Sequence, residues 1–201
     1  MRLSDTKCAV LLEAFKLFAT KPYDQVTFNE LEASTGLSRG AILYHIKNKE
    51  TLFRLVIDDY VFSKSTLTAV YESEFKNYSL TNFIQKFVDF CIVEKSEFKE
   101  MGLLNMNLSM LKIEATAFHH YPLMEEKAAE WYENELVIWI KVIERAIKEK
   151  EIKEEIDVKM IANLFLNVYL GTSYSGIVKT KGYDIHLMKK EFLFIYDTIK
   201  I

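Results

Sequence analysis

Several side chains that can bind an anion gather in one short segment of the sequence. Arg39 carries five N–H donors in a planar fork, a shape that fits a guanine edge or a phosphate group. Tyr44 and His45 can donate hydrogen bonds to phosphate oxygens, and Lys49 adds a positive charge. Donors of these kinds, close together in sequence, indicate a surface that binds nucleic acid.

Two short helices are expected to position these donors. Thr27 and Glu30 have the spacing of a capping box, so the first helix should run from 28 to 35. Gly36 should end this helix, because glycine adopts the left-handed conformation without a Cβ penalty. Two short helices joined by a turn of about 3–4 residues that contains Gly form the helix-turn-helix pattern.

The second helix is expected from 39 to about 46, with Ser38 as its N-cap. Ile42 and Ile46, four residues apart, form an apolar stripe with Leu43. The other side of the helix keeps the donors and two small residues that allow close approach to the backbone, Gly40 and Ala41. In this pattern the second helix is the one that would enter a DNA major groove.

The segment 36–53, GLSRGAILYHIKNKETLF, resembles the DNA-binding signature of the TetR family, the tetracycline-repressor-like transcriptional regulators. The matching residues are Gly36, Ser38, Arg39, Gly40, Tyr44, His45, Ile46, Lys47 and Lys49. The sequence departs from the family pattern at two positions, where Leu43 stands in place of the usual Tyr and Glu32 in place of the usual Ala.

The resemblance implies an all-α fold of about nine helices, in which a three-helix head precedes a larger ligand-binding and dimerisation domain. We predict that the helix-turn-helix domain spans 1–48 and that the second domain spans 49–201. The resemblance also implies a homodimeric transcriptional regulator, a repressor that leaves a palindromic double-stranded DNA operator when a small molecule binds.

In the head, Arg39 is predicted to contact a base, and the predicted phosphate contacts are Thr27, Ser38, Tyr44, His45 and Lys49. Together with Gly40 and Ala41 these residues make up the predicted DNA-binding site. The charge distribution agrees with this placement. Residues 1–55 hold eight Lys and Arg against six Asp and Glu, whereas the remainder holds 18 against 23.

Composition independently favours an all-α protein of one or two domains. Among 201 residues there are six Gly and two Pro, so few residues interrupt helices, and half of the chain is hydrophobic. Helical spacing and capping residues predict nine helices, at 4–20, 28–35, 39–46, 49–74, 80–94, 97–112, 122–150, 158–179 and 185–199. The stretch 114–121 has no clear assignment.

The last two predicted helices have the character of a dimer interface. Small residues predominate in 171–176 (GTSYSG), and the final helix is apolar on two sides. A helix of this kind needs cover from more than one direction, either from its own chain or from a second copy. We favour a homodimer, because operators usually consist of two half-sites about 34 Å apart.

Aromatic and Met residues in the middle of the chain could either pack a core or line a cavity. Met adapts to irregular gaps, and aromatic rings line apolar ligand pockets. We predict a mostly apolar effector pocket formed by Phe87, Cys91, Met106, Met110, Phe118, His119 and Trp131. Asn105, Asn107 and Tyr121 are further candidates for polar anchors.

No metal site, cofactor or catalytic residue is predicted. His119 and His120 lie near Glu125 and Glu126, but adjacent histidines on a helix point in different directions and no further ligand has useful spacing. Two alternatives to a ligand-controlled regulator remain. One is an adaptor with the same fold that acts through a protein partner, and the other is an α-helical enzyme that uses the His119 region.

The two cysteines, Cys8 and Cys91, predict no disulfide framework and are interpreted as reduced, small apolar residues. The chain has no signal-peptide pattern at its start and no run of eighteen apolar residues. We therefore expect a cytoplasmic protein with no membrane partner.

Overall fold

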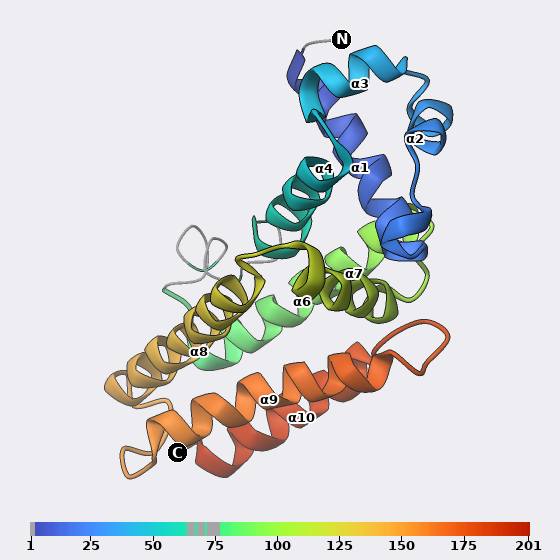
Figure 1. Cartoon of the computed structure of the whole chain (residues 1–201). Helices are drawn as coiled ribbons and strands as arrows, with labels where there is room; N and C mark the ends of the chain where they lie inside the picture. The colour runs from blue at the N-terminus through green and yellow to red at the C-terminus, as the bar shows by residue number, and fades with distance from the viewer. Residues whose placement is uncertain (1–2, 64–66, 68–70, 72–76) are drawn as a thin grey trace. The chain divides into compact units, whose positions relative to one another are not determined.

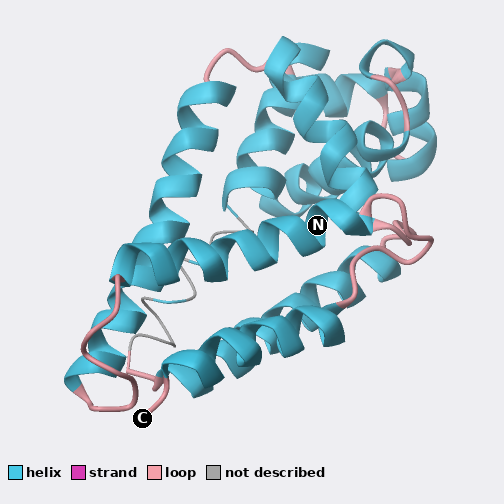
Figure 2. Cartoon of the chain, turned by 90° about the horizontal axis from the view of Figure 1, so that it is seen from below, coloured by secondary structure: helices cyan, strands magenta, loops and turns pink. Residues whose placement is uncertain are grey.

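The structure, a computed structural model, describes residues 3–63, 67, 71 and 77–201, with side chains omitted at 3–5, 45 and 63. Within these residues the backbone forms nine α-helices (Figure 1). The described part contains no strand beyond one isolated antiparallel bridge between Ile152 and Lys200, and the rest is loops (Figure 2). The prediction of an all-α fold with about nine helices is confirmed.

Contacts divide the chain into two compact units. The first, the head unit, comprises Met1–Ser65 and Ser109–Ala128, and the second, the C-terminal unit, comprises Thr66–Leu108 and Ala129–Ile201. The head unit contains α1 (Leu3–Thr20), η1 (Tyr23–Gln25), α2 (Phe28–Thr35), α3 (Arg39–Ile46), α4 (Lys49–Val56) and η2 (Ile57–Ser63). The predicted functional boundary after residue 48 is a different division and stays a prediction.

The remaining helices are α6 (Leu80–Glu100), α7 (Met106–His120), α8 (Met124–Lys148), α9 (Val158–Gly176) and α10 (Ile185–Ile199). Both α7 and α8 contribute to the two units, because the last part of α7 and the start of α8 belong to the head unit. Ser79, Asp157 and Asp184 accept hydrogen bonds from backbone N–H groups in the first turns of α6, α9 and α10. The helix starts expected at 80, 158 and 185 are therefore confirmed.

The prediction for 80–112 is wrong in one respect. Instead of ending at 94, α6 continues to Glu100, and the next helix begins at Met106. Gly102 has φ +83, its N–H donates to the Lys99 carbonyl, and the N–H of Leu103 donates to the Phe98 carbonyl. This is a Schellman motif, and it ends α6 by satisfying carbonyls that have no partner within the helix.

Three other predicted boundaries differ from the structure. The helix expected from 49 changes to a π-helix at Ile57, and most of its predicted second half lies outside the described residues. The helix expected to begin at Pro122 begins at Met124, after a turn, and α9 ends at Gly176 rather than at 179. The unassigned stretch 114–121 continues α7 up to His120.

Aromatic side chains form the centre of the C-terminal unit. Trp139 is fully buried on α8 and stacks on Phe165 of α9, with ring centroids 4.8 Å apart and planes 7° apart. The rings of Phe83, Phe87 and Phe192 surround the same indole at 5.1 to 5.6 Å. The packing joins α6, α8, α9 and α10, and α9 and α10 lie side by side in both views (Figures 1 and 2).

Two asparagines fasten the loop between α9 and α10 to the start of α7. The Asn105 amide donates to the carbonyls of Gly176 at 3.1 Å and Lys179 at 2.6 Å, while its oxygen accepts from the N–H of Leu108. Asn107 accepts from the N–H of Tyr183 at 2.8 Å. The amide groups of Asn105 and Asn107 therefore bind backbone atoms within the protein. We had considered these two side chains as polar anchors for a ligand. No helix in the described part combines the length and apolarity needed to cross a membrane.

Candidate nucleic-acid interface

Local sequence signals shape the helix-turn-helix as expected. Thr27 accepts from the N–H of Glu30, and the Glu30 carboxylate accepts from the N–H of Thr27, which completes the capping box. Gly36 ends α2 with φ +69. The Ser38 hydroxyl accepts from the N–H of Ala41 and caps α3. Both helices therefore begin and end where the pattern predicts.

Apolar contacts fix α3 on the helices that support it. Ile42 and Ile46 are fully buried, which confirms the expected stripe. Helices α1, α2 and α4 all pack against α3 (Figure 1). Phe18 of α1 and Phe53 of α4 meet edge to face at 4.9 Å and contribute to this small core. The support leaves the opposite side of α3 facing outward.

The outward side of α3 presents the residues predicted to meet DNA. Tyr44 is 77% exposed, and Arg39 has half of its side chain in solvent. A Cβ added at Gly40 would meet no atom within 4 Å, so this part of the helix is open. Ala41 is half-buried. The backbone of His45 lies in α3, and its side chain lies outside the described part of the chain.

Arg39 is held by α2. Its Nε lies 3.0 Å from Oε1 of Glu32, and its Nη2 donates to Oδ1 of Asn29 at 2.9 Å. The guanidinium also lies 5.9 Å from the centre of the Phe28 ring. Glu32 thus points partly outward, and its carboxylate lies against the arginine predicted to read a base.

The ammonium group of Lys49 is already bound within the head, whereas a phosphate contact would need free N–H donors. Its ammonium donates to the backbone carbonyls of Asp24 and Val26, at 3.3 and 3.1 Å, and lies 4.5 Å from the Tyr23 ring centre. It thereby joins the start of α4 to the segment that leads into α2. Lys49 therefore stabilises the head through internal contacts, and its contact with phosphate stays a prediction.

The seven residues predicted to line an effector pocket are divided between the two units. Phe87 packs against Trp139, Tyr169 and Phe192 in the core, and Cys91 is buried on the same helix. Met106 is also buried in the C-terminal unit, where Trp131 is half-buried. Phe118, His119 and the half-buried Met110 belong to the head unit.

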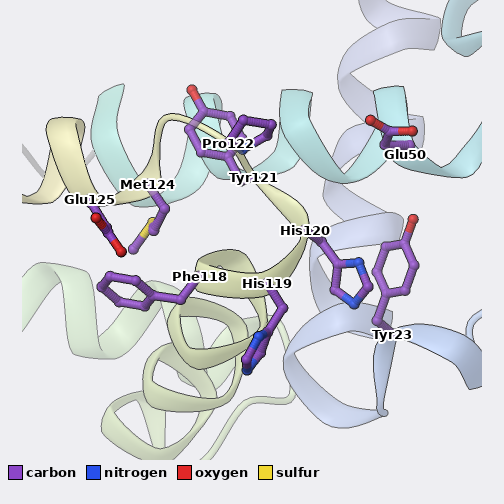
Figure 3. Close-up of a pocket in the computed structure, with 9 residues that line it drawn as sticks. All are labelled: Tyr23, Glu50, Phe118, His119, His120, Tyr121, Pro122, Met124 and Glu125. Carbon is purple, nitrogen blue, oxygen red and sulfur yellow. The ribbon is translucent and has the colours of Figure 1, made fainter.

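Phe118 and His119 line a pocket of about 340 Å³ in the head unit. Its other lining residues are Tyr23, Glu50, His120, Tyr121, Pro122, Met124 and Glu125 (Figure 3). Sequence reasoning did not identify Tyr23, Glu50 or His120 as its partners. Figure 3 shows the imidazole of His120 beside the Tyr23 ring, with Phe118 near Met124. The pocket is therefore lined by aromatic rings together with carboxylates and imidazoles.

Next to this pocket, Asp58 of η2 receives two donors. The Tyr121 hydroxyl donates to Asp58 at 2.6 Å, and Lys127 of α8 forms an ion pair with the same carboxylate. These contacts raise the pKa of Lys127, because hydrogen bonding to Asp58 favours its charged form. The turn between α7 and α8 is thereby attached to the segment that follows α4.

The carboxyl groups of half-buried Glu114 and buried Glu135 have strongly raised pKa values. Burial raises the pKa of Glu114 to about 7. Burial also raises the pKa of Glu135 to about 8. A backbone hydrogen bond from Leu67 lowers this pKa, and the charge of Glu94 raises it by a smaller amount. Among the described residues, no group of three or more His, Cys, Asp or Glu could hold a metal ion.

Comparison with known proteins agrees with this geometry. Residues 10–56 match the family described as "Bacterial regulatory proteins, tetR family". A segment of 51 residues is 45% identical to the HTH-type transcriptional repressor AcnR of Corynebacterium jeikeium strain K411, and it covers 25% of this chain. The matched segment spans about a quarter, 27%, of the length of that relative.

Solved structures resemble the whole fold. A TetR-family transcriptional regulator from Agrobacterium tumefaciens has a TM-score of 0.67 at 12% identity, with 100% of both chains covered. NalD, the secondary repressor of the MexAB-OprM multidrug efflux pump in Pseudomonas aeruginosa, has a TM-score of 0.60 at 13% identity, with 99% of this chain and 98% of NalD covered.

The fold and the candidate interface together define an all-helical protein with an N-terminal helix-turn-helix. Residues 10–56 thus match the tetR family of bacterial regulatory proteins, and the chain as a whole shares its fold with solved TetR-family regulators.

Proposed function

We propose that this protein is a sequence-specific DNA-binding transcriptional regulator, and that it acts as a homodimeric repressor. The observation that carries the proposal is the exposed side of α3, where Arg39 and Tyr44 face outward over buried Ile42 and Ile46. A helix held in this way by α1, α2 and α4 can enter a major groove without rearrangement of its supports. The matched relative AcnR is itself described as a transcriptional repressor.

Exposed apolar side chains on α9 and α10 support the homodimer. Met160 and Leu164 on α9 are 57% and 43% exposed, and Phe194 on α10 is 72% exposed. The two helices lie side by side, and the small exposed residue Gly171 leaves open space above α9. A second copy of the same pair would cover this surface and form a four-helix interface, which places two heads on one palindromic operator.

Release by a small molecule is the regulatory part of the proposal. The pocket lined by Phe118 and His119 belongs to the same compact unit as the helix-turn-helix. To release the protein from DNA, a ligand must bind more tightly to the state in which the two heads do not fit two successive major grooves. The pocket combines aromatic rings with the carboxylates of Glu50 and Glu125, so the effector is expected to place an apolar ring or chain against Phe118 and polar groups near these carboxylates.

Selection of bound sequences from a random DNA pool, at two salt concentrations, tests the DNA-binding part. A palindromic consensus whose affinity falls steeply with salt is the expected result, because Lys and Arg contacts with phosphate release counterions. Recovery of no preferred sequence by the purified protein would contradict the proposal and would favour an adaptor that works through a protein partner.

Sedimentation of the Phe194→Asp variant tests the dimer. A charge at this exposed position should convert the dimer to a monomer while the helical circular dichroism stays unchanged. Val178→Asp is a suitable control, because Val178 is 89% exposed beyond the end of α9. A wild-type protein that sediments as a monomer at micromolar concentration would refute the proposed assembly.

A further inference from the structure

The contacts of Arg39 leave one edge of its guanidinium available. Nε is engaged by the Glu32 carboxylate, and one N–H of Nη2 is engaged by Asn29. A guanidinium has five N–H groups, so the two on Nη1 and one on Nη2 remain. One N–H of Nη1 and one of Nη2 lie on the end of the fork, an edge that can form two parallel hydrogen bonds with the O6 and N7 atoms of guanine.

The partners that engage the other edge come from the preceding helix. Asn29 and Glu32 are three residues apart in α2, so their side chains project from the same face. Phe28 supports the guanidinium at 5.9 Å. Arg39 is the first residue of α3, and α2 therefore determines the direction of its side chain across the turn.

We propose that Glu32 and Asn29 are positioning residues that determine which base Arg39 reads. A long arginine side chain loses rotamer freedom when it binds, and residues that hold it in advance reduce this loss at the correct base pair. Held from α2, the fork reaches one position in the groove, whereas a released side chain can reach phosphates and neighbouring bases. The inference rests on the proposed function, because it requires that α3 enters DNA.

The test uses variants of the whole 201-residue chain and compares their discrimination on the operator selected by the wild-type protein. Arg39→Ala first identifies the base pair at which preference is lost. Glu32→Ala and Asn29→Ala are then measured on the operator and on the operator changed at that pair. We expect each to lower the preference for the correct pair about fivefold or more, since a well-aligned bidentate contact contributes about 1–3 kcal/mol of discrimination.

Glu13→Gln provides the matched control for charge. Glu13 lies on α1 and pairs with Lys16, and the variant removes one negative charge from the same unit without touching Arg39. It should strengthen binding to both DNAs by the same small factor. Glu32→Gln keeps an acceptor for Nε but removes the charge, so it should retain more discrimination than Glu32→Ala.

A double-mutant comparison separates positioning from a structural role. Glu32→Ala in the Arg39→Ala background should cause no further loss of preference at that base pair, because its effect passes through Arg39. The melting temperature should change little, since the ion pair is partly exposed.

Three results would overturn the inference. The first is that Glu32→Ala and Asn29→Ala discriminate between the two DNAs as well as the wild type does. The second is that they bind both DNAs equally more weakly and melt at a lower temperature. The third is that Glu32→Ala still lowers the preference for the correct base pair when Arg39 is already replaced by Ala. A wild-type protein with no sequence preference would refute the proposed function itself, and the inference with it.

Discussion

The imidazole of His120 stacks on the ring of Tyr23, with centroids 4.0 Å apart and planes 16° apart. Tyr23 lies in η1, directly ahead of α2, and its ring also meets Phe53 edge to face at 5.2 Å. The end of α7 therefore contacts the segment that leads into the helix-turn-helix. Adjacent His119 is exposed and lines the pocket beside it.

Replacement of His120 should weaken the head unit. We expect His120→Ala to lower the free energy of unfolding by about 1 kcal/mol, because it removes an aromatic pair. Urea denaturation followed by circular dichroism measures the change. His119→Ala is the matched control and should have a smaller effect. Equal losses in the two variants would show that the stacking on Tyr23 contributes nothing.

Gly176 allows the close approach of two segments in the C-terminal unit. A Cβ at this position would lie 2.5 Å from the backbone N of Tyr183 and 2.6 Å from Oδ1 of Asn107. Backbone would have to move, so Gly176→Ala should cost about 2 kcal/mol or more.

The control for this substitution is Gly40→Ala in α3, where the new Cβ meets no atom within 4 Å. There the loss of backbone freedom in the unfolded chain favours folding, by about 0.5–1 kcal/mol. Thermal unfolding of both variants at one protein concentration gives the comparison. A Gly176→Ala variant as stable as Gly40→Ala would contradict the close packing at Gly176.

Stability should fall as pH rises because of Glu135. Its pKa is raised to about 8 in the folded protein, above the usual 4.5 of an unfolded carboxyl group. Between these values the folded state binds the proton that the unfolded state has released, so stability decreases from about pH 4.5 to about pH 8 and then levels.

Glu135→Gln should therefore stabilise the protein at pH 8, on the order of a few kcal/mol, and should have little effect near pH 4.5. Melting temperatures at pH 5, 6.5 and 8 provide the measurement. Glu133→Gln, an exposed neighbour on α8, should leave the pH dependence as in the wild type. If Glu135→Gln showed the same pH dependence of stability as the wild type, the Glu135 carboxyl group would not be its cause.

The two cysteines should differ in reactivity. Cys8 is exposed, whereas Cys91 is buried and its burial raises the thiol pKa, so little thiolate forms. At pH 8 an aromatic disulfide reagent should label one thiol in the folded protein and two after unfolding in urea. Cys8→Ser should abolish the rapid reaction, and a rapid reaction that remains in this variant would contradict the burial of Cys91.

The elements that the sequence predicted best are those with local signals. Thr27 with Glu30, Gly36 and Ser38 define the helix-turn-helix within a dozen residues, and each acts on backbone groups nearby. Asp157 and Asp184 similarly predict the starts of α9 and α10. Such signals depend on a few neighbouring residues, so one sequence is enough to read them.

Features that depend on distant residues were not predictable in this way. Met and Leu surround Gly102, so periodicity did not reveal that α6 ends there. Periodicity marks Phe87 as apolar, but its contact with Trp139 requires the packing of two helices. The pairs His120 with Tyr23 and Arg39 with Glu32 likewise become visible only when separate helices are placed together.

Titration of the selected operator by wild-type protein and by Arg39→Ala shows whether α3 reads DNA through Arg39. The wild-type affinity should fall steeply between 50 and 200 mM salt, as expected for several phosphate contacts. Arg39→Ala should bind the operator more weakly by about 1–3 kcal/mol and should keep the weaker binding to unrelated DNA. Equal affinities of the two proteins for the operator would show that Arg39 does not read it.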